Sequence, residues 1–247
     1  MRRIDWGYQE THVAPLEFEL ADRVIVQSEF GHRSFVEEAF PADRLVTLPR
    51  AVDLGEFTPG TEKEGRRFRV LFVGMVCLRK GFLDLARAWK ELALPGGELW
   101  VVGQVHDEVI PLLGPYRENP TIRFIGHTKG GAADYYANAD AFVLPSIIEG
   151  SAKTTYEAMS AALPVITTVN AGSVVRDNVD GFIVPIRDPD SIRDKLLFLY
   201  ENRERAREMG TSGRNRVGEF SWEIYENRLI SLYRDLPHRY AAPFSGS

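Results

Sequence analysis

Short apolar runs alternate along the chain with longer amphipathic stretches, and this alternation predicts strands separated by helices. The apolar runs predict strands at 23–27, 44–48, 68–73, 98–102, 121–125, 140–144, 164–168 and 181–184. Helical spacing fills most of the gaps, at 29–39, 82–93, 107–113, 131–138, 153–162 and 190–201. Strands that are apolar nearly throughout are buried on both faces. The pattern therefore predicts an α/β fold built on a doubly wound parallel sheet with flanking helices.

The rhythm of strands and helices is uneven, and the unevenness predicts domain boundaries. Residues 49–66 hold two prolines, three glycines and many charges, and indicate a linker. The six strands within 67–220 complete a Rossmann-like domain, whereas 1–48 are too short to close a core, so we expect a remnant of an N-terminal domain there. Residues 202–236 are predicted helical, and 221–236 form an amphipathic C-terminal helix with Trp222 and Leu229 on one face. Residues 237–247 are expected to be a loose tail.

Composition and charge narrow the class of protein. Thirty Lys and Arg against 35 Asp and Glu give a formal net charge of −5, which removes the usual electrostatic drive for binding nucleic acid. A single cysteine, Cys77, excludes an intramolecular disulfide framework. The chain shows neither a signal peptide nor an apolar run of membrane-spanning length. We therefore expect a cytoplasmic protein, with peripheral membrane contact left open.

A first candidate site follows the strand at 68–73. Gly74 begins a short loop, and Arg79-Lys80-Gly81 are expected to open the next helix, so two cations and backbone N–H groups come together. That combination suits phosphate oxygens. The loop lacks the spacing of a phosphate-binding P-loop. The alternative is a solvated basic turn that begins a helix.

A second candidate site follows the strand at 140–144. Glu149 stands just before a predicted helix and Glu157 lies inside it, with Ser151 as the expected N-cap. Amides between the two carboxylates can hold an anion, while carboxylates accept hydrogen bonds from hydroxyls. A ligand with a central diphosphate and hydroxylated rings at both ends would fit. The alternative is that Glu149 is a surface carboxylate and Glu157 a residue of the helix face.

A third segment follows the strand at 121–125. Gly126 permits a tight turn whose backbone could contact a base, and His127 is a weaker candidate for chemistry, since a lone loop histidine is more often only hydrogen-bonded. Asp188-Pro189-Asp190 matches a metal–nucleotide D-x-D pattern. We instead interpret Asp188 as an N-cap, Pro189 as the first helical residue and Asp190 as a first-turn acid. Cys77 is interpreted as a spectator, and no metal site is predicted.

Together these segments resemble the C-terminal, donor-binding half of a retaining glycosyltransferase of the GT-B fold, family 4 (group 1). The resemblance covers about residues 20–236. It rests on the E-x7-E pair in EGSAKTTYEAMSAALPVI, on FVGMVCLRKGF, VVGQVHDEV and RFIGH, and on NAGSVVRDNVDGFIVPIRDPDSI and FSWEIYENRLISLYR. A lone E-x7-E pair is weak, but these blocks in register are a specific signal.

The resemblance implies a nucleotide-diphosphate sugar, of UDP, GDP or ADP type, as the donor substrate, without a cofactor or divalent metal. Glu157 would accept hydrogen bonds from the ribose, Glu149 would hold hydroxyls of the transferred sugar, and Lys80, supported by Arg79, would neutralise the leaving diphosphate. The catalytic set is then Glu149, Lys80 and Arg79. The remaining donor-binding residues are Gly74, Met75, Gly103, Ile125, Gly126, His127, Ser151, Ala152, Lys153, Thr154 and Glu157.

The sequence departs from the family pattern at several places. Met75 stands where arginine is common, Ser151-Ala152-Lys153 replace small and aromatic residues, and Ala162 replaces glycine. Most of the family's N-terminal, acceptor-binding domain has no counterpart in the chain. We therefore expect donor binding with inefficient transfer unless a separate N-terminal domain or self-association completes the cleft. The acceptor is a glycan, a lipid or a small molecule.

Two other classes compete with this interpretation. A non-catalytic nucleotide-sugar-binding or scaffolding module would explain Met75, but retention of Glu149, Glu157 and Lys80 counts against it. A dehydrogenase-like nucleotide domain should carry G-x-G-x-x-G after its first strand, and the sequence has none.

Overall fold

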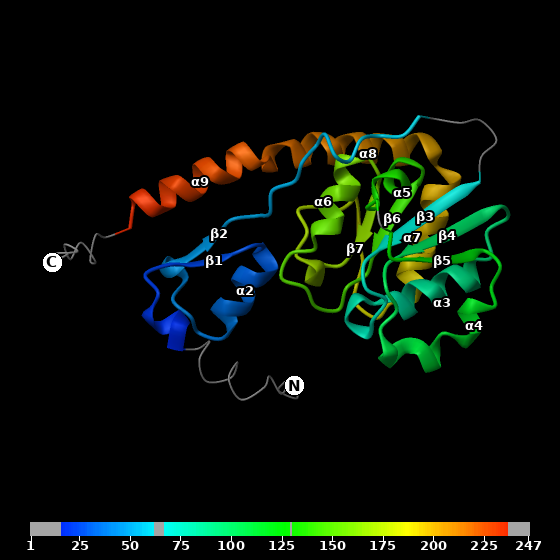
Figure 1. Ribbon diagram of the computed structural model, residues 1–247, viewed down its shortest axis with the longest axis horizontal. Helices are drawn as coiled ribbons and strands as arrows, with labels where there is room; N and C mark the ends of the chain where they lie inside the picture. Colours follow the sequence, from blue (N-terminus) through cyan, green and yellow to red (C-terminus); the bar gives the residue numbers. More distant parts are fainter. Residues whose placement is uncertain (1–15, 62–66, 129, 237–247) are drawn as a thin grey trace.

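The computed structural model describes residues 16–61, 67–128 and 130–236. Its two sheets are both parallel (Figure 1). β1 and β2 form the smaller sheet, and the larger has the order β5-β4-β3-β6-β7-β8. The strand bounds are β1 (Val24–Val26), β2 (Leu45–Thr47), β3 (Phe68–Val73), β4 (Gly97–Val102), β5 (Ile122–Gly126), β6 (Ala141–Leu144), β7 (Val165–Thr167) and β8 (Gly181–Ile183). Every predicted strand is confirmed to within one residue at each end, and so is the doubly wound parallel sheet.

The helices follow the predicted segments with one clear exception. They are α2 (Glu29–Glu37), α3 (Phe82–Leu92), α4 (Gly114–Arg117), α5 (Ala133–Ala137), α6 (Lys153–Ser160), α7 (Pro189–Glu201), α8 (Arg203–Val217) and α9 (Trp222–Arg234). Short 3-10 turns are η1 (Ala42–Arg44), η2 (Leu78–Lys80), η3 (Asp107–Leu112), η4 (Val169–Ala171) and η5 (Gly218–Phe220). The α-helix predicted at 107–113 is wrong. Pro111 lies inside η3, and because proline lacks an N–H and its ring crowds the preceding turn, the segment stays a 3-10 turn and α4 follows separately.

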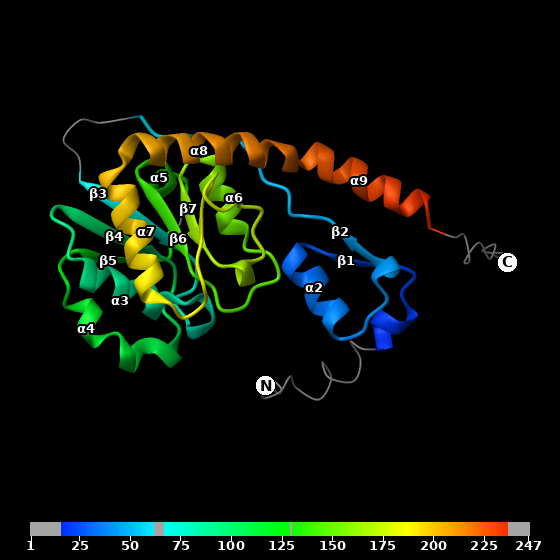
Figure 2. The ribbon, with the colours of Figure 1, turned by 180° about the vertical axis from the view of Figure 1, so that it is seen from behind.

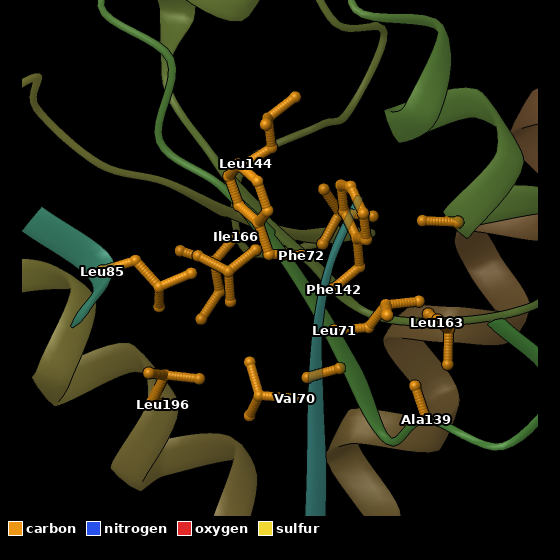
Figure 3. Close-up of a cluster of buried hydrophobic side chains, with 14 of the residues drawn as sticks. Val70, Leu71, Phe72, Leu85, Ala139, Phe142, Leu144, Leu163, Ile166 and Leu196 are labelled. Atoms are coloured by element: carbon orange, nitrogen blue, oxygen red, sulfur yellow. The ribbon is translucent and has the colours of Figure 1, made fainter. Parts of the chain in front are cut away.

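The hydrophobic core lies on both faces of the six-stranded sheet. Val70, Leu71 and Phe72 of the central strand β3 are completely buried, so consecutive residues on opposite faces are all covered. Figure 3 shows Leu85 of α3 and Leu196 of α7 on one side of β3, with Phe142 of β6 on the other. Helix α3 packs on α7, and α6 packs on α8. This double cover explains why the strands are apolar nearly throughout.

The predicted linker is partly buried. Within its described part, 49–61, no helix or strand forms, yet Val52 and Phe57 are 2% and 4% exposed and join the large core. The N–H of Val52 donates to the carbonyl of Phe220 at 3.1 Å. The segment is therefore packed along the larger sheet rather than being a free tether, a feature that its prolines, glycines and charges do not predict. Residues 62–66 lie outside the described part.

The small sheet belongs to an N-terminal lobe with a minor core of its own. Val24, Val26 and Leu45 are buried there, with Phe35 and Phe40 packed against them. Residues 16–20 are helical and α2 completes the lobe, while the first 15 residues of the predicted N-terminal remnant lie outside the described part.

The C-terminal helical segment is broken, contrary to a continuous helix over 202–236. Helix α8 ends at Val217, η5 intervenes, and Ser221 caps α9 by accepting a hydrogen bond from the N–H of Ile224 at 3.3 Å. On this helix Trp222 is 55% exposed and Leu229 is half-buried. Helix α9 extends from the larger sheet toward the side that holds β1 and β2 (Figures 1 and 2).

Two further points concern the ends of the chain and membrane spans. The predicted tail at 237–247 lies outside the described residues. Within 16–61, 67–128 and 130–236, none of the helices has both the length and the apolar character needed to cross a bilayer.

Candidate functional site

The order of the strands places a topological switch point at the middle of the sheet. β3 and β6 are neighbours, but the chain leaves β3 toward β4 on one side and leaves β6 toward β7 on the other. The loops that follow these two strands therefore diverge at the carboxyl edge. In open parallel sheets ligands bind at such a switch point. The first two candidate segments predicted from the sequence are these two loops.

The loop after β3 is packed tightly against its neighbours. Gly81 has φ +67°, and a Cβ built on it would lie 2.0 Å from the carbonyl oxygen of Pro145 in the loop after β6. Only glycine fits there, and the close approach holds the two loops together. Arg79 and Lys80 do not open the helix as expected. They belong to η2, Gly81 has the left-handed conformation, and α3 begins at Phe82.

The two loops meet through three charged side chains. Lys80 Nζ lies 2.6 Å and Arg79 Nη1 lies 2.7 Å from the same oxygen, Oε2 of Glu149. Glu149 and Lys80 are 17% and 13% exposed, and Arg79 is 49% exposed. Burial alone would raise the pKa of Glu149, but hydrogen bonds from the two cations, together with their charges, hold that pKa below its ordinary value. Glu149 is therefore a carboxylate at neutral pH.

Backbone hydrogen bonds fix the loop that carries Glu149. The N–H of Glu149 donates to the carbonyl of Asn170 at 2.9 Å, and the N–H of Ile147 donates to the carbonyl of Arg79 at 2.8 Å. The carboxylate and its cations are thus held by a backbone framework as well as by their mutual attraction.

Helix α6 begins without a side-chain cap. The expectation that Ser151 is the N-cap is wrong: Ala152 occupies that position, and the Ser151 hydroxyl is hydrogen-bonded to the buried Tyr156 hydroxyl at 3.3 Å. The N–H of Ala152 donates to the carbonyl of Ala171 at 2.9 Å, so this amide is already engaged. The first turn holds no acidic residue and carries Lys153. The first N–H groups of a helix lack intrahelical acceptors, so this positive helix end can receive an anion.

The second predicted carboxylate, Glu157, is almost fully buried inside α6. It is 7% exposed, and each of its oxygens has one partner. The Tyr136 hydroxyl donates to Oε2 at 2.8 Å, and Lys153 Nζ lies 3.1 Å from Oε1. The interpretation of Glu157 as an ordinary residue of the helix surface does not agree with this burial.

The predicted glycines line up beside this site. The N–H of Gly103 donates to the carbonyl of Gly126 at 2.9 Å, and a Cβ on Gly103 would lie 2.0 Å from the carbonyl oxygen of Gly74. The ends of β3, β4 and β5 therefore stack backbone on backbone. Gly126 has φ +77°, Ile125 is half-buried and His127 is exposed. Met75 is 46% exposed beside Gly74.

Sequence reasoning missed three residues that hold this site. The Ser28 hydroxyl donates to the carbonyl of Gly150 at 2.6 Å, and Arg50 Nε donates to the carbonyl of Ser151 at 3.0 Å. Both come from the N-terminal lobe or its connection to the larger sheet. Tyr136, the partner of Glu157, is the third. Ser28 precedes a helix and does cap α2, so its sequence context points only to that local role.

A cavity of about 420 Å³ lies elsewhere, between the N-terminal lobe and the η5–α9 region. Its lining includes Ser28, Thr47, Ser173, Arg216 and Phe220, and none of the predicted donor-binding residues.

The D-x-D match is a helix cap, as interpreted. Asp188 Oδ1 accepts a hydrogen bond from the N–H of Ser191 at 3.0 Å, and Pro189 is the first residue of α7. In the part of the chain that the structure describes, no three His, Cys, Asp or Glu side chains group so as to hold a metal ion. Cys77 is buried.

Comparison with known proteins identifies similar sequences and folds. The family model described as "Glycosyl transferases group 1" matches residues 67–202. A D-inositol 3-phosphate glycosyltransferase from Segniliparus rotundus is 29% identical over 236 residues, covering 87% of this chain and 52% of that protein. The chain spans about half the length of the curated relatives it matches.

Solved structures show the same fold. A sucrose-phosphate synthase from Thermosynechococcus elongatus superposes with a TM-score of 0.83 at 25% identity, over 95% of this chain and 63% of the other. HepE from Anabaena, solved in complex with UDP and glucose, superposes with a TM-score of 0.81 at 16% identity, over 94% of this chain and 68% of the other.

Proposed function

The chain belongs to the group 1 glycosyltransferases, and we propose that it is the donor-binding portion of a retaining enzyme that takes its sugar from a nucleotide-diphosphate sugar. The observation that carries this proposal is the meeting of Lys80 and Arg79 with Glu149 at the point where the loops after β3 and β6 diverge. Two cations and a carboxylate that can accept hydrogen bonds from sugar hydroxyls lie there beside the N-terminus of α6, which has no side-chain cap.

The roles follow from the charges of the ligand's parts. The diphosphate would take Lys80 and Arg79 as partners, together with backbone amides among residues 151–154 other than that of Ala152, which already donates to the Ala171 carbonyl. Glu149, released from part of its pairing, would accept hydrogen bonds from hydroxyls of the transferred sugar. Glu157 would accept them from the ribose, and the base would lie near Ile125, Gly126 and His127. Supporting this arrangement, Gly126 has open space where a Cβ would stand, and Gly103 packs so closely on Gly74 that a Cβ there would lie 2.0 Å from the Gly74 carbonyl oxygen.

The chemistry then depends on charge that develops on the leaving group. Breaking the anomeric C–O bond leaves its electron pair on the diphosphate, and cations already fixed beside that oxygen stabilise the transition state. Removing one such donor typically lowers the rate by about 10²–10³-fold. In this proposal Glu149 orients the sugar through hydrogen bonds to its hydroxyls and does not attack the anomeric carbon. We propose retention of configuration and no requirement for a divalent metal.

Transfer itself needs an acceptor wall. The chain spans about half of its curated relatives, and we propose that a further acceptor-binding domain, or a second copy, faces the carboxyl edge during transfer. Met75 leaves Arg79 to serve the phosphate that an arginine after Gly74 would otherwise contact. The acceptor is a glycan, a lipid or a small molecule.

Thermal unfolding with UDP-, GDP- and ADP-sugars tests donor binding directly. A ligand at a hundred times its Kd adds about 2.7 kcal/mol to the free energy of unfolding, which raises the Tm by about 5–10 °C for a chain of this size. UDP-glucose is the first probe, because HepE was solved with UDP and glucose. We expect the nucleotide sugars of one base to raise the Tm, and we expect the Glu157→Ala substitution to abolish this increase. If the protein is folded and none of the nucleotide sugars changes its Tm, the result would contradict donor binding and favour a scaffolding module.

A further inference from the structure

Tyr136 is a buried ionisable residue with no role in the proposed chemistry. It lies in α5 with no exposed surface. Its ring packs edge-on against Phe57 at 5.3 Å between centroids, and tilted against Phe142 of β6 at 5.8 Å. The connecting segment and the sheet therefore hold the ring from two sides, and the position of its hydroxyl is fixed by packing.

The hydroxyl of Tyr136 has one proton and two acceptors within reach. Glu157 Oε2 lies 2.8 Å away and the carbonyl oxygen of Thr154 lies 3.3 Å away. Because Glu157 is closer and charged, the Tyr136 hydroxyl donates its stronger hydrogen bond to this carboxylate. Burial, followed by the charge and hydrogen bond of Glu157, raises the pKa of Tyr136 well above its ordinary value, so the hydroxyl stays a donor throughout the physiological range.

The two oxygens of Glu157 therefore differ. Oε2 faces a rigid, neutral donor in the interior, while Oε1 faces Lys153, whose flexible side chain is 57% exposed. An incoming hydroxyl can displace or join Lys153, but it cannot displace Tyr136. The carboxylate is thus anchored at one oxygen and available at the other.

We propose that Tyr136 is a positioning residue that sets the recognition of ribose hydroxyls, by locking Oε2 of Glu157 so that Oε1 is presented to the donor. This inference rests on the proposed function. It assigns the preference of the nucleotide site for ribose over dideoxyribose to a residue that does not contact the ligand. Without the Tyr136 hydroxyl, the carboxylate would turn toward Lys153 and lose its fixed direction.

The test compares a nucleoside diphosphate with its 2′,3′-dideoxy counterpart, using whichever of UDP, GDP and ADP binds the wild type most tightly. Titration calorimetry gives both Kd values for each variant. We expect the wild type to prefer the ribose form by about ten-fold or more, the range for hydrogen bonds to a charged acceptor. Tyr136→Phe, which removes only the hydroxyl, should reduce that preference at least three-fold, mainly by weakening the ribose form.

Tyr135→Phe is the matched control. Tyr135 is the neighbouring residue on α5, and its ring packs against Trp100 instead, so its removal should leave the preference unchanged. The readout is a ratio within one variant, so a loss of stability affects both ligands alike and cancels. A folded Tyr136→Phe variant with the full wild-type preference would overturn the inference while leaving donor binding intact. If none of the three diphosphates bound the wild type, donor binding and this inference would fail together.

Discussion

Two carboxylates of this protein are each held by several cations, at opposite edges of the same sheet. Glu98 lies at the amino ends of the strands, 2.9 Å from Arg67, 3.4 Å from Arg69 and 2.7 Å from Arg123. The Trp100 indole also donates to it at 3.1 Å, and the carboxylate is only 4% exposed. Arg69 pairs with Glu98 across β3 and β4, so the backbone ladder fixes the distances.

Glu149 lies at the carboxyl ends and its cations come from a loop. Arg79 and Lys80 belong to η2 rather than to a strand, and Arg79 is half exposed. The chemistry of the two clusters is the same, but their supports differ. Ion pairs set on neighbouring strands keep one arrangement, whereas pairs between two loops at a switch point can exchange partners with a ligand. We propose from this difference that Glu98 serves stability and Glu149 serves binding.

The largest expected effect separates the cations of the two clusters. Lys80→Ala should weaken nucleoside diphosphate binding by about ten- to hundred-fold, because a charge-assisted hydrogen bond to phosphate is lost. Arg67→Ala removes a cation of similar reach at the other edge and should leave the Kd unchanged. Calorimetric titration of both variants with the same diphosphate measures the difference. Equal losses of affinity would show that only the overall charge matters.

For the free energy of unfolding, we expect the larger effect at the Glu98 cluster and the smaller effect at the Glu149 cluster. Glu98→Ala leaves Arg69 and the Trp100 indole without their acceptor and should lower the free energy of unfolding by about 2 kcal/mol. Glu149→Ala should lower it by less than Glu98→Ala does, because water can solvate the half-exposed Arg79 and only Lys80, 13% exposed, is left buried without its partner. Urea unfolding monitored by circular dichroism measures both. A larger loss for Glu149→Ala would reverse the assignment of the two clusters.

The fold could be predicted from the sequence because its signal is local. Parallel strands covered on both faces are apolar nearly throughout, and the central strands show this in their own residues, as AFVL does in β6. Asp188 and Pro189 likewise announce the start of α7 within a few residues. The α-helix predicted at 107–113 was wrong because the apolar residues there have helical spacing, while Pro111 restricts the backbone to a 3-10 turn.

The candidate site could be predicted only in its charged residues. Glu149, Glu157, Arg79 and Lys80 stand after strands and can be placed at the edge by topology alone. Their supports come from distant segments: Ser28 reaches Gly150 across a separation of 122 residues. Nothing near Ser28 or Tyr136 distinguishes a residue that orients a loop from an ordinary cap or core tyrosine. The expected Ser151 cap failed for a similar reason, because Tyr156 competes for its hydroxyl.

Ser28→Ala should have a smaller effect that links the N-terminal lobe to the site. It removes the cap of α2, in which Ser28 Oγ accepts from the N–H of Gly31 at 3.0 Å, and the bond to Gly150. We expect about 1 kcal/mol of lost stability and a few-fold weaker sugar-nucleotide binding. Ser34→Ala, on the same helix, is the control, because the Ser34 hydroxyl bonds only within the lobe to Gly31. If Ser28→Ala left the Kd unchanged, the N-terminal lobe would have no effect on binding at the site through this residue.

The smallest effect is a pH dependence that compares the two carboxylates. Burial alone would raise the pKa of Glu98, but hydrogen bonds from Arg67 and Trp100 and the nearby charge of Arg123 hold it below the ordinary value of 4.5. A lowered pKa in the folded state stabilises the fold above the unfolded-state pKa, and this contribution disappears as the pH falls through the folded-state value. The difference in unfolding free energy between wild type and Glu98→Gln should therefore be constant above about pH 5.5 and narrow below about pH 4.5.

For Glu149→Gln the difference from wild type should narrow in the same way, because the pKa of Glu149 is also lowered. Saturating nucleoside diphosphate should reduce this narrowing, since in the proposed complex the ligand takes Lys80 and Arg79 from the carboxylate. Urea unfolding at several pH values, with and without the diphosphate, measures both curves, and a Glu98→Gln curve that changed equally with ligand would remove the distinction between the two edges of the sheet.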